Sequence, residues 1–316
     1  MYLEPIFLIP VFKERIWGGT RLREEFNYNT PSNMTGECWG ISAHKNGQSV
    51  VKSGTFKGLT LGELWRRQTY LFGGTTEKEF PLLVKILDAN NDLSVQVHPD
   101  DVYAQKIENG EKGKTECWYI LDCKKDAEII IGHNANTIAE FKHLIEDGNW
   151  NSLLRRVKIK PGDFFYVPSG TIHAIGEGTL ILETQQSSDT TYRIYDYDRI
   201  DNKGLKRELH LEKAIDVISI PHQDYQINSQ VEYKDGFSKV TFVEGKYFTV
   251  QKWDVTNEAS FNQDKPFKLL SIINGYGDII VNSTSYPLEK GDHVILPYNL
   301  GEYKISGNVS MIVSHM

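Results

Sequence analysis

The chain has 316 residues, of which 40% are hydrophobic and 24% are charged, and its formal net charge is −7. These values are ordinary for a globular protein, and the length is sufficient for one large domain or two. The negative charge argues against a nucleic-acid-binding surface but leaves room for a local basic pocket that binds one phosphate.

The sequence also indicates a compartment. No apolar run is long enough to span a bilayer, and Met1–Pro5 lacks the basic and apolar regions of a signal peptide. Cys38, Cys117 and Cys123 include no Cys-x-x-Cys pair and are expected to be reduced thiols. We therefore expect a cytoplasmic protein that binds neither a membrane nor nucleic acid.

The first part of the chain predicts an apolar segment followed by a helix. The apolar segment ends near Trp17, which suits either the protein core or a pocket wall. Residues 59–71 are predicted to be helical, because Thr60 is a suitable N-cap and Glu63 stands three residues later, as in a capping box.

Lys85 interrupts the nearly continuous apolar strand predicted over residues 81–89. An unpaired charge inside such a strand is costly, so Lys85 must reach a partner or a wet cavity. An edge-strand lysine is an equally acceptable interpretation. Lys85 is therefore a candidate pocket residue with an open alternative.

Residues 93–98 alternate apolar and polar side chains, the pattern of a half-buried strand. Ser94, Gln96 and His98 then share one face. Gln and His two residues apart on one face can bind the same ion. For these residues alone, an ordinary sheet surface is the simpler interpretation.

Two later stretches favour a metal site. Lys114 and Glu116 share one face of a second predicted strand, and residues 161–173 read as a turn, a buried strand and a second turn that ends in His173. Nitrogen and oxygen ligands of this kind suit zinc, with iron or manganese as alternatives. The predicted ligands are Gln96, His98, Glu116 and His173.

Two further helices are predicted. Residues 137–154 have a suitable cap in Thr137 and an apolar stripe that Gly148 interrupts. Residues 208–218 are amphipathic, and their helix should end before Pro221. Neither helix carries a candidate site.

A polar segment follows the strand predicted over residues 178–186. It contains Asp189 and Arg193. Arginine suits an anionic oxygen, because its charge is permanent and its donors are forked. The alternative for Arg193 is a surface salt bridge with one of the aspartates nearby.

The residues around His173 match a known motif. Gly162, Pro168, Gly170 and His173 fit the second cupin motif, Gly-x5-Pro-x-Gly-x2-His. The first cupin motif is matched with a glutamine in place of its first histidine. That replacement, with Gln-x-His-Pro-Asp and Lys-x-Glu, resembles the short bacterial form of the type I mannose-6-phosphate isomerases. The similarity runs from Trp17-Gly18 to the strand around Arg193.

The resemblance implies a mainly β fold of two cupin-like jelly-roll barrels, with a small helical insertion at about 137–155 and a connecting helix. We expect a metal-binding catalytic domain over 1–205, the connecting helix over 206–222 and a second cupin-like domain over 223–316. The second domain should lack metal. Residues 290–297 repeat the Gly-Asp and Pro of the first unit, but Glu302 stands where His173 would fall. His293 is then structural or exposed.

The resemblance implies an isomerase that interconverts mannose 6-phosphate and fructose 6-phosphate. One zinc ion would assist proton transfer between C1 and C2 through an enediol. Arg193 is the catalytic candidate, since it would stabilise the enediolate or orient the reacting end. The expected substrate residues are Trp17, Lys85, Ser94, Lys114, Glu183 and Asp189.

Two points stay open within this interpretation. Ser94 and Lys114, with Lys85, are the candidates for binding the substrate phosphate. The proton-transfer base is Glu183, Lys114, Asp189 or a metal-bound water, and sequence spacing does not choose among them.

Three other classes are compatible with a cupin barrel. A different metal-dependent cupin enzyme, such as an iron dioxygenase, is disfavoured because Gln96 replaces one of its usual three histidines. A non-enzymatic sugar-binding or regulatory cupin is disfavoured by the complete ligand set together with Arg193. A secreted storage-type cupin is disfavoured by the lack of a signal peptide.

Overall fold

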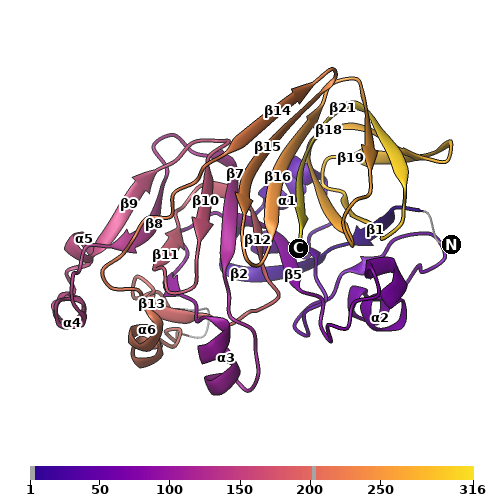
Figure 1. Ribbon diagram of the computed structural model, residues 1–316. Coiled ribbons are helices and arrows are strands. Elements are labelled where there is room, and N and C mark those ends of the chain that lie inside the picture. The colour runs from indigo at the N-terminus through magenta and orange to yellow at the C-terminus, as the bar shows by residue number, and fades with distance from the viewer. Residues whose placement is uncertain (1–3, 201–203) are drawn as a thin grey trace.

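The computed structural model describes residues 4–200 and 204–316. The predicted mainly β class is confirmed: the described residues form three sheets, with short helices at the periphery (Figure 1). None of the helices in these ranges is long and apolar enough to cross a membrane.

Two sheets form the N-terminal unit. The six-stranded sheet has the order β10-β7-β12-β5-β3-β2 and the five-stranded sheet has the order β13-β6-β11-β8-β9. The strands of the first are β2 (Val11–Gly19), β3 (Thr35–Ile41), β5 (Leu82–Ala89), β7 (Glu116–Cys123), β10 (Phe164–Val167) and β12 (Thr179–Gln186). Those of the second are β6 (Val95–Val97), β8 (Glu128–His133), β9 (Leu154–Lys158), β11 (His173–Ile175) and β13 (Tyr192–Tyr195).

The two N-terminal sheets pack face to face around one apolar cluster. Leu87, Trp118 and Ile181 come from the six-stranded sheet, while Ile129 and Ile175 come from the five-stranded sheet. Burial of these side chains closes the unit into a sandwich whose interior also holds the polar site.

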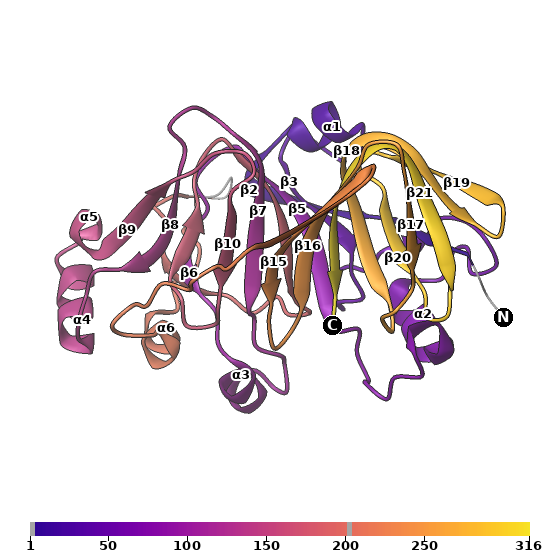
Figure 2. The same cartoon turned by 45° about the horizontal axis from the view of Figure 1, so that its top comes forward.

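A ten-stranded sheet forms most of the C-terminal unit, which lies beside the first (Figure 2). Its main path is β14-β15-β16-β21-β18-β20-β1-β4, with β17 and β19 attached to β21 and β18. The strands are β1 (Ile6–Ile9), β4 (Val50–Val51), β14 (Gln230–Lys234), β15 (Phe237–Glu244), β16 (Thr249–Val255), β17 (Glu258–Asn262), β18 (Lys268–Val281), β19 (Thr284–Glu289), β20 (His293–Leu296) and β21 (Glu302–His315).

The N-terminal strand β1 belongs to the C-terminal sheet. Ile6 is opposite Ile295 on β20, in an antiparallel pair. One hydrophobic cluster continues through both units, since it contains Ile86 and Leu182 as well as Leu269. The domain division at residues 205 and 223 stays a prediction, and β1 crosses it.

Two predicted helices differ from those observed. The helix predicted over 59–71 is α2 (Leu61–Arg67) followed by a 3₁₀ turn, η1 (Thr69–Phe72), although the capping box of Thr60 and Glu63 is present. The helix over 137–154 is two helices, α4 (Ile138–Glu146) and α5 (Trp150–Leu153), because Gly148 has a φ of +64° that no continuous helix allows.

In the C-terminal unit, β18 is continuous over Lys268–Val281. Gly275 and Gly277 resemble a turn in the sequence, but they lie beside the backbone of β21, next to a register shift at Ile272. The remaining helices are α1 (Arg21–Phe26), α3 (Asp101–Ile107) and the connecting helix α6 (Leu211–Val217).

Candidate active site

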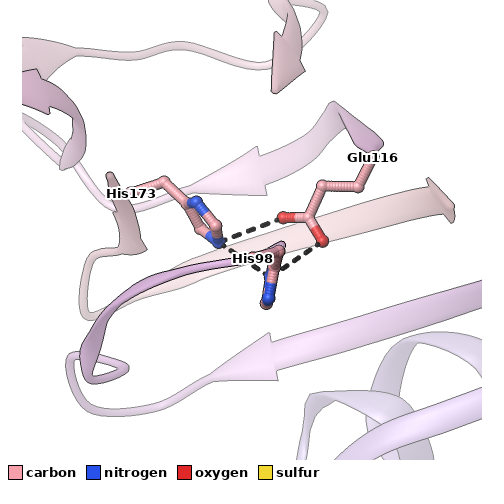
Figure 3. A group of neighbouring side chains, drawn as sticks. All are labelled: His98, Glu116 and His173. Carbon is pink, nitrogen blue, oxygen red and sulfur yellow. Dashed lines mark hydrogen bonds and ion pairs between the residues drawn. The ribbon is translucent and has the colours of Figure 1, made fainter. Parts of the chain in front are cut away.

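The candidate metal ligands come from both sheets of the N-terminal unit. Gln96 on β6 is directly opposite His173 on β11. His98 lies just beyond the end of β6, and Glu116 begins β7 in the facing sheet. The ligand atoms of His98, Glu116 and His173 all lie within 4.8 Å of one another, and all three residues are buried (Figure 3).

The two histidines are held as neutral metal ligands. His98 Nδ1 lies 2.8 Å from the Thr190 carbonyl oxygen, and His173 Nδ1 lies 2.9 Å from that of Thr171. Because a carbonyl only accepts, each Nδ1 carries the proton, and each Nε2 therefore presents a lone pair. Burial, with Lys114 nearby, lowers the pKa of His98 to about 3, and burial also lowers the pKa of His173.

Glu116 completes a cluster of the kind that can hold a metal ion. The Nε2 atoms of His98 and His173 lie 3.1 Å apart, and Glu116 Oε1 lies 3.3 Å from His173 Nε2. Oε1 is buried and accepts no hydrogen bond from any described residue. Burial would raise the pKa of Glu116, but Lys114 and the two histidines hold it well below its usual range. Two lone pairs and an unsatisfied carboxylate oxygen therefore fit a divalent metal with nitrogen and oxygen ligands.

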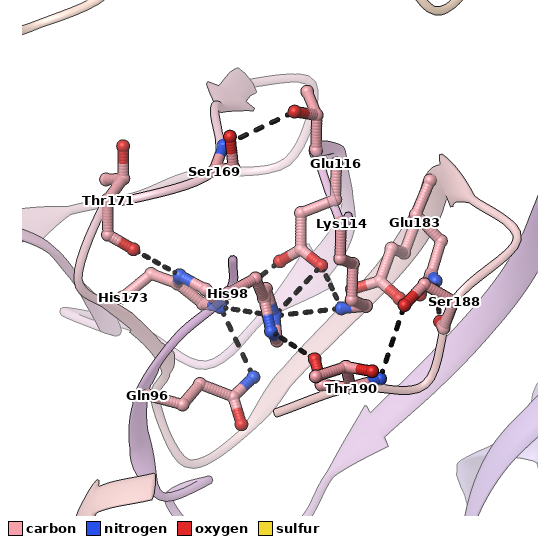
Figure 4. Close-up of polar contacts among 12 residues, drawn as sticks. Gln96, His98, Lys114, Glu116, Ser169, Thr171, His173, Glu183, Ser188 and Thr190 are labelled. Atoms are coloured by element: carbon pink, nitrogen blue, oxygen red, sulfur yellow. Dashed lines mark hydrogen bonds and ion pairs between the residues drawn. The ribbon is translucent and has the colours of Figure 1, made fainter. Parts of the chain in front are cut away.

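Gln96 and Lys114 border this cluster (Figure 4). Gln96 Nε2 lies 3.2 Å from His173 Nε2, and rotation of the amide would turn its oxygen toward the same point. Lys114 Nζ donates to His98 Nε2 at 2.9 Å and forms an ion pair with Glu116. Gln96 is thus available as a fourth ligand, and Lys114 lies at the metal end of the site.

A cavity of about 470 Å³ opens beside the cluster. All seven residues predicted to act on substrate line it, together with Gln96: Trp17, Lys85, Ser94, Lys114, Glu183, Asp189 and Arg193. The residues predicted from separate strands and loops of the sequence thus lie on one continuous surface. A larger cavity of about 630 Å³ lies elsewhere, between α2, α3 and the C-terminal unit, and contains none of these residues.

Two interpretations were left open: Lys85 as a pocket lysine or an edge-strand lysine, and Trp17 as a core residue or part of a pocket wall. Lys85 is only 4% exposed on an interior strand of the six-stranded sheet, so it is not an edge lysine. Its Nζ lies 3.4 Å from Glu183 Oε1 and over the ring of Trp39, 5.0 Å from the centroid. Trp17 is buried in the core cluster and also lines the cavity, so both interpretations apply.

Glu183 occupies an unusual environment for a carboxylate. It is buried, and its Oε2 accepts a hydrogen bond from Trp118 Nε1 at 3.2 Å. Burial and the neighbouring Glu116 raise the pKa of Glu183, although Lys114 and Lys85 act in the opposite direction. By contrast, Lys85 and Asn46 hold the pKa of Asp189 below its ordinary value, against the effect of burial.

Arg193 lies in the cavity wall and not in a surface salt bridge. Its Nε donates to Ser94 Oγ at 3.3 Å, and its Nη1 donates to the Glu208 carbonyl oxygen at 2.7 Å. No carboxylate of residues 4–200 or 204–316 lies within ion-pair distance of its guanidinium. The charge of Arg193 is therefore available to an anion in the cavity.

Sequence reasoning missed four charged residues of the cavity. They are Glu14, Arg15, Glu37 and Arg207. Arg15 stands two residues before Trp17 on β2, so strand alternation could have indicated it. Glu37 and Arg207 lie in stretches with no distinguishing pattern. His293, by contrast, is buried against Ser271 in the C-terminal unit, in agreement with its structural interpretation.

Comparison with known proteins identifies the family. Residues 6–131 match the family described as phosphomannose isomerase type I, catalytic domain, and residues 238–316 match the mannose-6-phosphate isomerase cupin domain. The mannose-6-phosphate isomerase ManA of Bacillus subtilis strain 168 is 58% identical over 316 residues, 100% of both chains. The chain belongs to the type I mannose-6-phosphate isomerase family.

Other members of the mannose-6-phosphate isomerase family agree over the full length. The Streptococcus mutans mannose-6-phosphate isomerase is 49% identical and covers 99% of this chain and 98% of its own. A crystal structure of a Bacillus subtilis mannose 6-phosphate isomerase is 54% identical and superposes with a TM-score of 0.98, over 99% of both chains. The predicted cupin fold and membership of an isomerase family are thereby confirmed.

Proposed function

We propose that this protein interconverts mannose 6-phosphate and fructose 6-phosphate with one zinc ion bound by Gln96, His98, Glu116 and His173. The observation that carries the proposal is the buried His98–Glu116–His173 cluster, which borders a polar cavity large enough for one hexose phosphate. A bound metal would supply Lewis-acid polarisation of the sugar oxygens.

The reaction moves one proton between C1 and C2 of the open sugar, and the chain must supply a base and a stabilising charge. Glu183 is the base that its surroundings favour, since burial raises its pKa and its Oε1 accepts no hydrogen bond from the described residues. Lys114 is engaged with His98 and Glu116, and the pKa of Asp189 is lowered. Arg193, which faces no carboxylate, would stabilise the enediolate or orient the reacting end.

The remaining cavity residues would bind and orient the substrate. Ser94 accepts a hydrogen bond from Arg193, and Lys85 is ion-paired with Glu183. Trp17 offers an apolar wall, and Asp189 accepts a hydrogen bond from Asn46 and can accept another from a sugar hydroxyl. A polar wall with few apolar faces suits a polyhydroxylated ligand.

We also propose that the partner is a phosphorylated hexose, that the enzyme works in the cytoplasm, and that it binds neither nucleic acid nor a membrane. The net charge of −7 and the three free cysteines support this setting. An acidic surface repels nucleic acid, and buried free thiols such as Cys38 suit a reducing compartment.

The test is conversion of mannose 6-phosphate to fructose 6-phosphate by the purified protein, measured as isolated, after chelation and after addition of zinc. We expect activity to disappear on chelation and to return with zinc. A zinc-loaded protein that binds mannose 6-phosphate without converting it would favour a sugar-binding cupin. Oxygen consumption by an iron-loaded sample would favour a dioxygenase.

A further inference from the structure

Asp189 is a cavity carboxylate with a single hydrogen-bond partner. It lines the cavity, in the segment between β12 and β13. Its Oδ2 accepts a hydrogen bond from Asn46 Nδ2 at 2.9 Å. Among residues 4–200 and 204–316, no other group donates to this carboxylate, and no cation lies within ion-pair distance of it. The Asn46 amide is therefore the contact that orients the Asp189 carboxylate.

The backbone of Asn46 is held on both sides by side chains, although the residue itself is exposed. His44 Nδ1 accepts a hydrogen bond from the Asn46 N–H at 3.2 Å, and Lys13 Nζ donates to the Asn46 carbonyl oxygen. The turn over residues 42–49, which follows β3, is closed because Ser49 N donates to the Ser42 carbonyl oxygen at 2.8 Å. A fixed backbone lowers the entropy that the Asn46 side chain must lose to reach Asp189.

His44 anchors this turn. It is buried, and its ring makes a T-shaped contact with Trp39, with the ring centroids 5.9 Å apart. Because Nδ1 accepts from a backbone N–H, the proton of the neutral ring is on Nε2. Burial lowers the pKa of His44, which keeps the ring neutral at pH values around 7. The acceptor that fixes the Asn46 backbone is therefore retained at neutral pH.

The surroundings of Asp189 favour its ionised form. Burial raises the pKa of this carboxyl, but Lys85 and the hydrogen bond from Asn46, followed by the charges of His44 and Lys114, hold it below its ordinary value. An ionised carboxylate only accepts hydrogen bonds. Since the Asn46 amide occupies Oδ2, Oδ1 is the oxygen left for a hydroxyl group in the cavity.

We propose that Asn46 is a positioning residue for the isomerase reaction, which holds Asp189 so that Oδ1 accepts a hydrogen bond from a hydroxyl of the sugar. His44 acts one step further away, by fixing the backbone of Asn46. A misplaced carboxylate would orient the sugar poorly, and poor orientation lowers the rate even when the reacting groups are intact. This inference rests on the proposed isomerase function, because it requires a sugar in the cavity.

The first test is Asn46→Leu, which keeps a similar side-chain shape but removes the donor. The kcat/KM for mannose 6-phosphate should fall about three- to thirtyfold, the range for loss of one hydrogen bond to a charged group near the surface. The zinc content and the thermal unfolding should not change, because Asn46 is exposed and contacts none of the candidate metal ligands. Asn134→Leu is the matched control and should leave kcat/KM unaltered. Asn134 is also exposed and donates at 2.9 Å to the Ser152 carbonyl oxygen.

Asn46→Asp gives a readout that a merely structural role would not move. At about pH 8 both carboxylates are ionised and repel each other, so Asp189 should lose its orientation. Toward about pH 5 the pair takes up one shared proton, which restores a hydrogen bond between them. The kcat/KM of Asn46→Asp, divided by that of the parent enzyme at the same pH, should therefore rise at least about threefold over this range. The same ratio for Asn46→Leu should stay constant.

His44→Phe tests the second step. Phenylalanine keeps a ring beside Trp39 but removes the acceptor for the Asn46 N–H. This change should lower kcat/KM less than Asn46→Leu does. Combined with Asn46→Leu, it should add less than about a twofold loss, because both changes act through the same hydrogen bond. Losses that multiply would overturn the role assigned to His44.

The outcomes distinguish this inference from the function on which it rests. A parent enzyme that does not convert mannose 6-phosphate would reject the isomerase proposal. With an active parent enzyme, an unaltered kcat/KM in Asn46→Leu would overturn the positioning role. A pH-independent ratio in Asn46→Asp, or a loss of zinc in either variant, would also overturn it, because each would show a general structural role.

Discussion

Lys85 and Glu183 stand directly opposite each other on β5 and β12, and Lys85 Nζ lies 3.4 Å from Glu183 Oε1. Both side chains are buried between two tryptophans, Trp39 beside the lysine and Trp118 beside the glutamate. Each charge offsets part of the desolvation cost of the other, so the sheet can hold a charged pair beside the cavity.

Lys85→Met should therefore change the pH dependence of catalysis. Without the lysine, the pKa of Glu183 should rise further, and the acid limb of kcat/KM should move upward by about 1–3 pH units. A pH–rate profile measures this shift, and Lys142→Met on the exposed face of α4 is the control. An acid limb at its original position would mean that Glu183 does not govern the profile.

His98→Ala should remove the metal and the activity together. The loss of a direct ligand should cost more than the ~10–100-fold that follows loss of an outer-shell partner. Metal analysis of the purified variant, alongside turnover of mannose 6-phosphate, checks this result. His143→Ala provides a control on a solvent-exposed histidine. Full zinc content in His98→Ala would show that the ligand set is wrong.

Arg193→Ala should separate catalysis from metal binding. The guanidinium contacts Ser94 and the Glu208 carbonyl but none of the metal ligands, so the zinc content should be unaffected. Removal of a group that stabilises developing negative charge should lower kcat about 10²–10³-fold. Steady-state kinetics with metal analysis on the same sample tests both statements, and near-normal turnover would reject the catalytic role.

His293 should make the protein less stable in acid. Burial lowers its pKa to about 4, from an ordinary value near 6.5. Between these two values the unfolded chain binds a proton that the folded chain does not, so stability falls as the pH falls. The contribution of this residue approaches about 3 kcal/mol at pH 4. Urea unfolding at several pH values should show a shallower pH dependence for His293→Gln than for the unchanged protein.

Leu269→Ala should destabilise both units at once. Leu269 is buried on β18, in the cluster that also contains Ile86 and Leu182 of the N-terminal unit. The substitution should lower the free energy of unfolding by about 2–5 kcal/mol and shift a single cooperative unfolding transition to lower denaturant concentration. Loss of bound zinc and loss of β-sheet signal should occur at the same denaturant concentration. Two separate transitions would mean that the units unfold independently.

Residues of the candidate site could be predicted from the sequence where the constraint acts between residues close together in the chain. Strand alternation placed Ser94, Gln96 and His98 on one face; Ser94 and Gln96 line the cavity, and His98 belongs to the cluster that could hold a metal. Lys85 could be predicted as a pocket residue because a charge in an apolar strand requires a compensating environment. The ion pair with Glu183 provides that environment. In these cases the physical constraint acts within a few residues and leaves a visible pattern.

The cavity residues that the sequence analysis missed depend on tertiary contacts. Arg207 lies in a stretch without periodicity, and only folding brings it against Asp196 and the cavity. Glu37 likewise is paired with Arg15, which lies on the neighbouring strand β2. The membership of β1 in the C-terminal sheet is a pairing across almost the whole chain, and no local pattern encodes it.

The position of β1 also bears on the order of assembly. Ile6 leaves the ribosome long before Ile295, its neighbour in the sheet, has been made. Until then the edge of β1 has no β20 to pair with, although β4 can cover its other side. Strands this distant in sequence pair slowly, because the chain loses the entropy of loop closure before it gains the favourable energy of the contact. We therefore expect the nascent chain to close the β1–β20 pairing only after β20 has left the ribosome, as a late step in the assembly of this sheet.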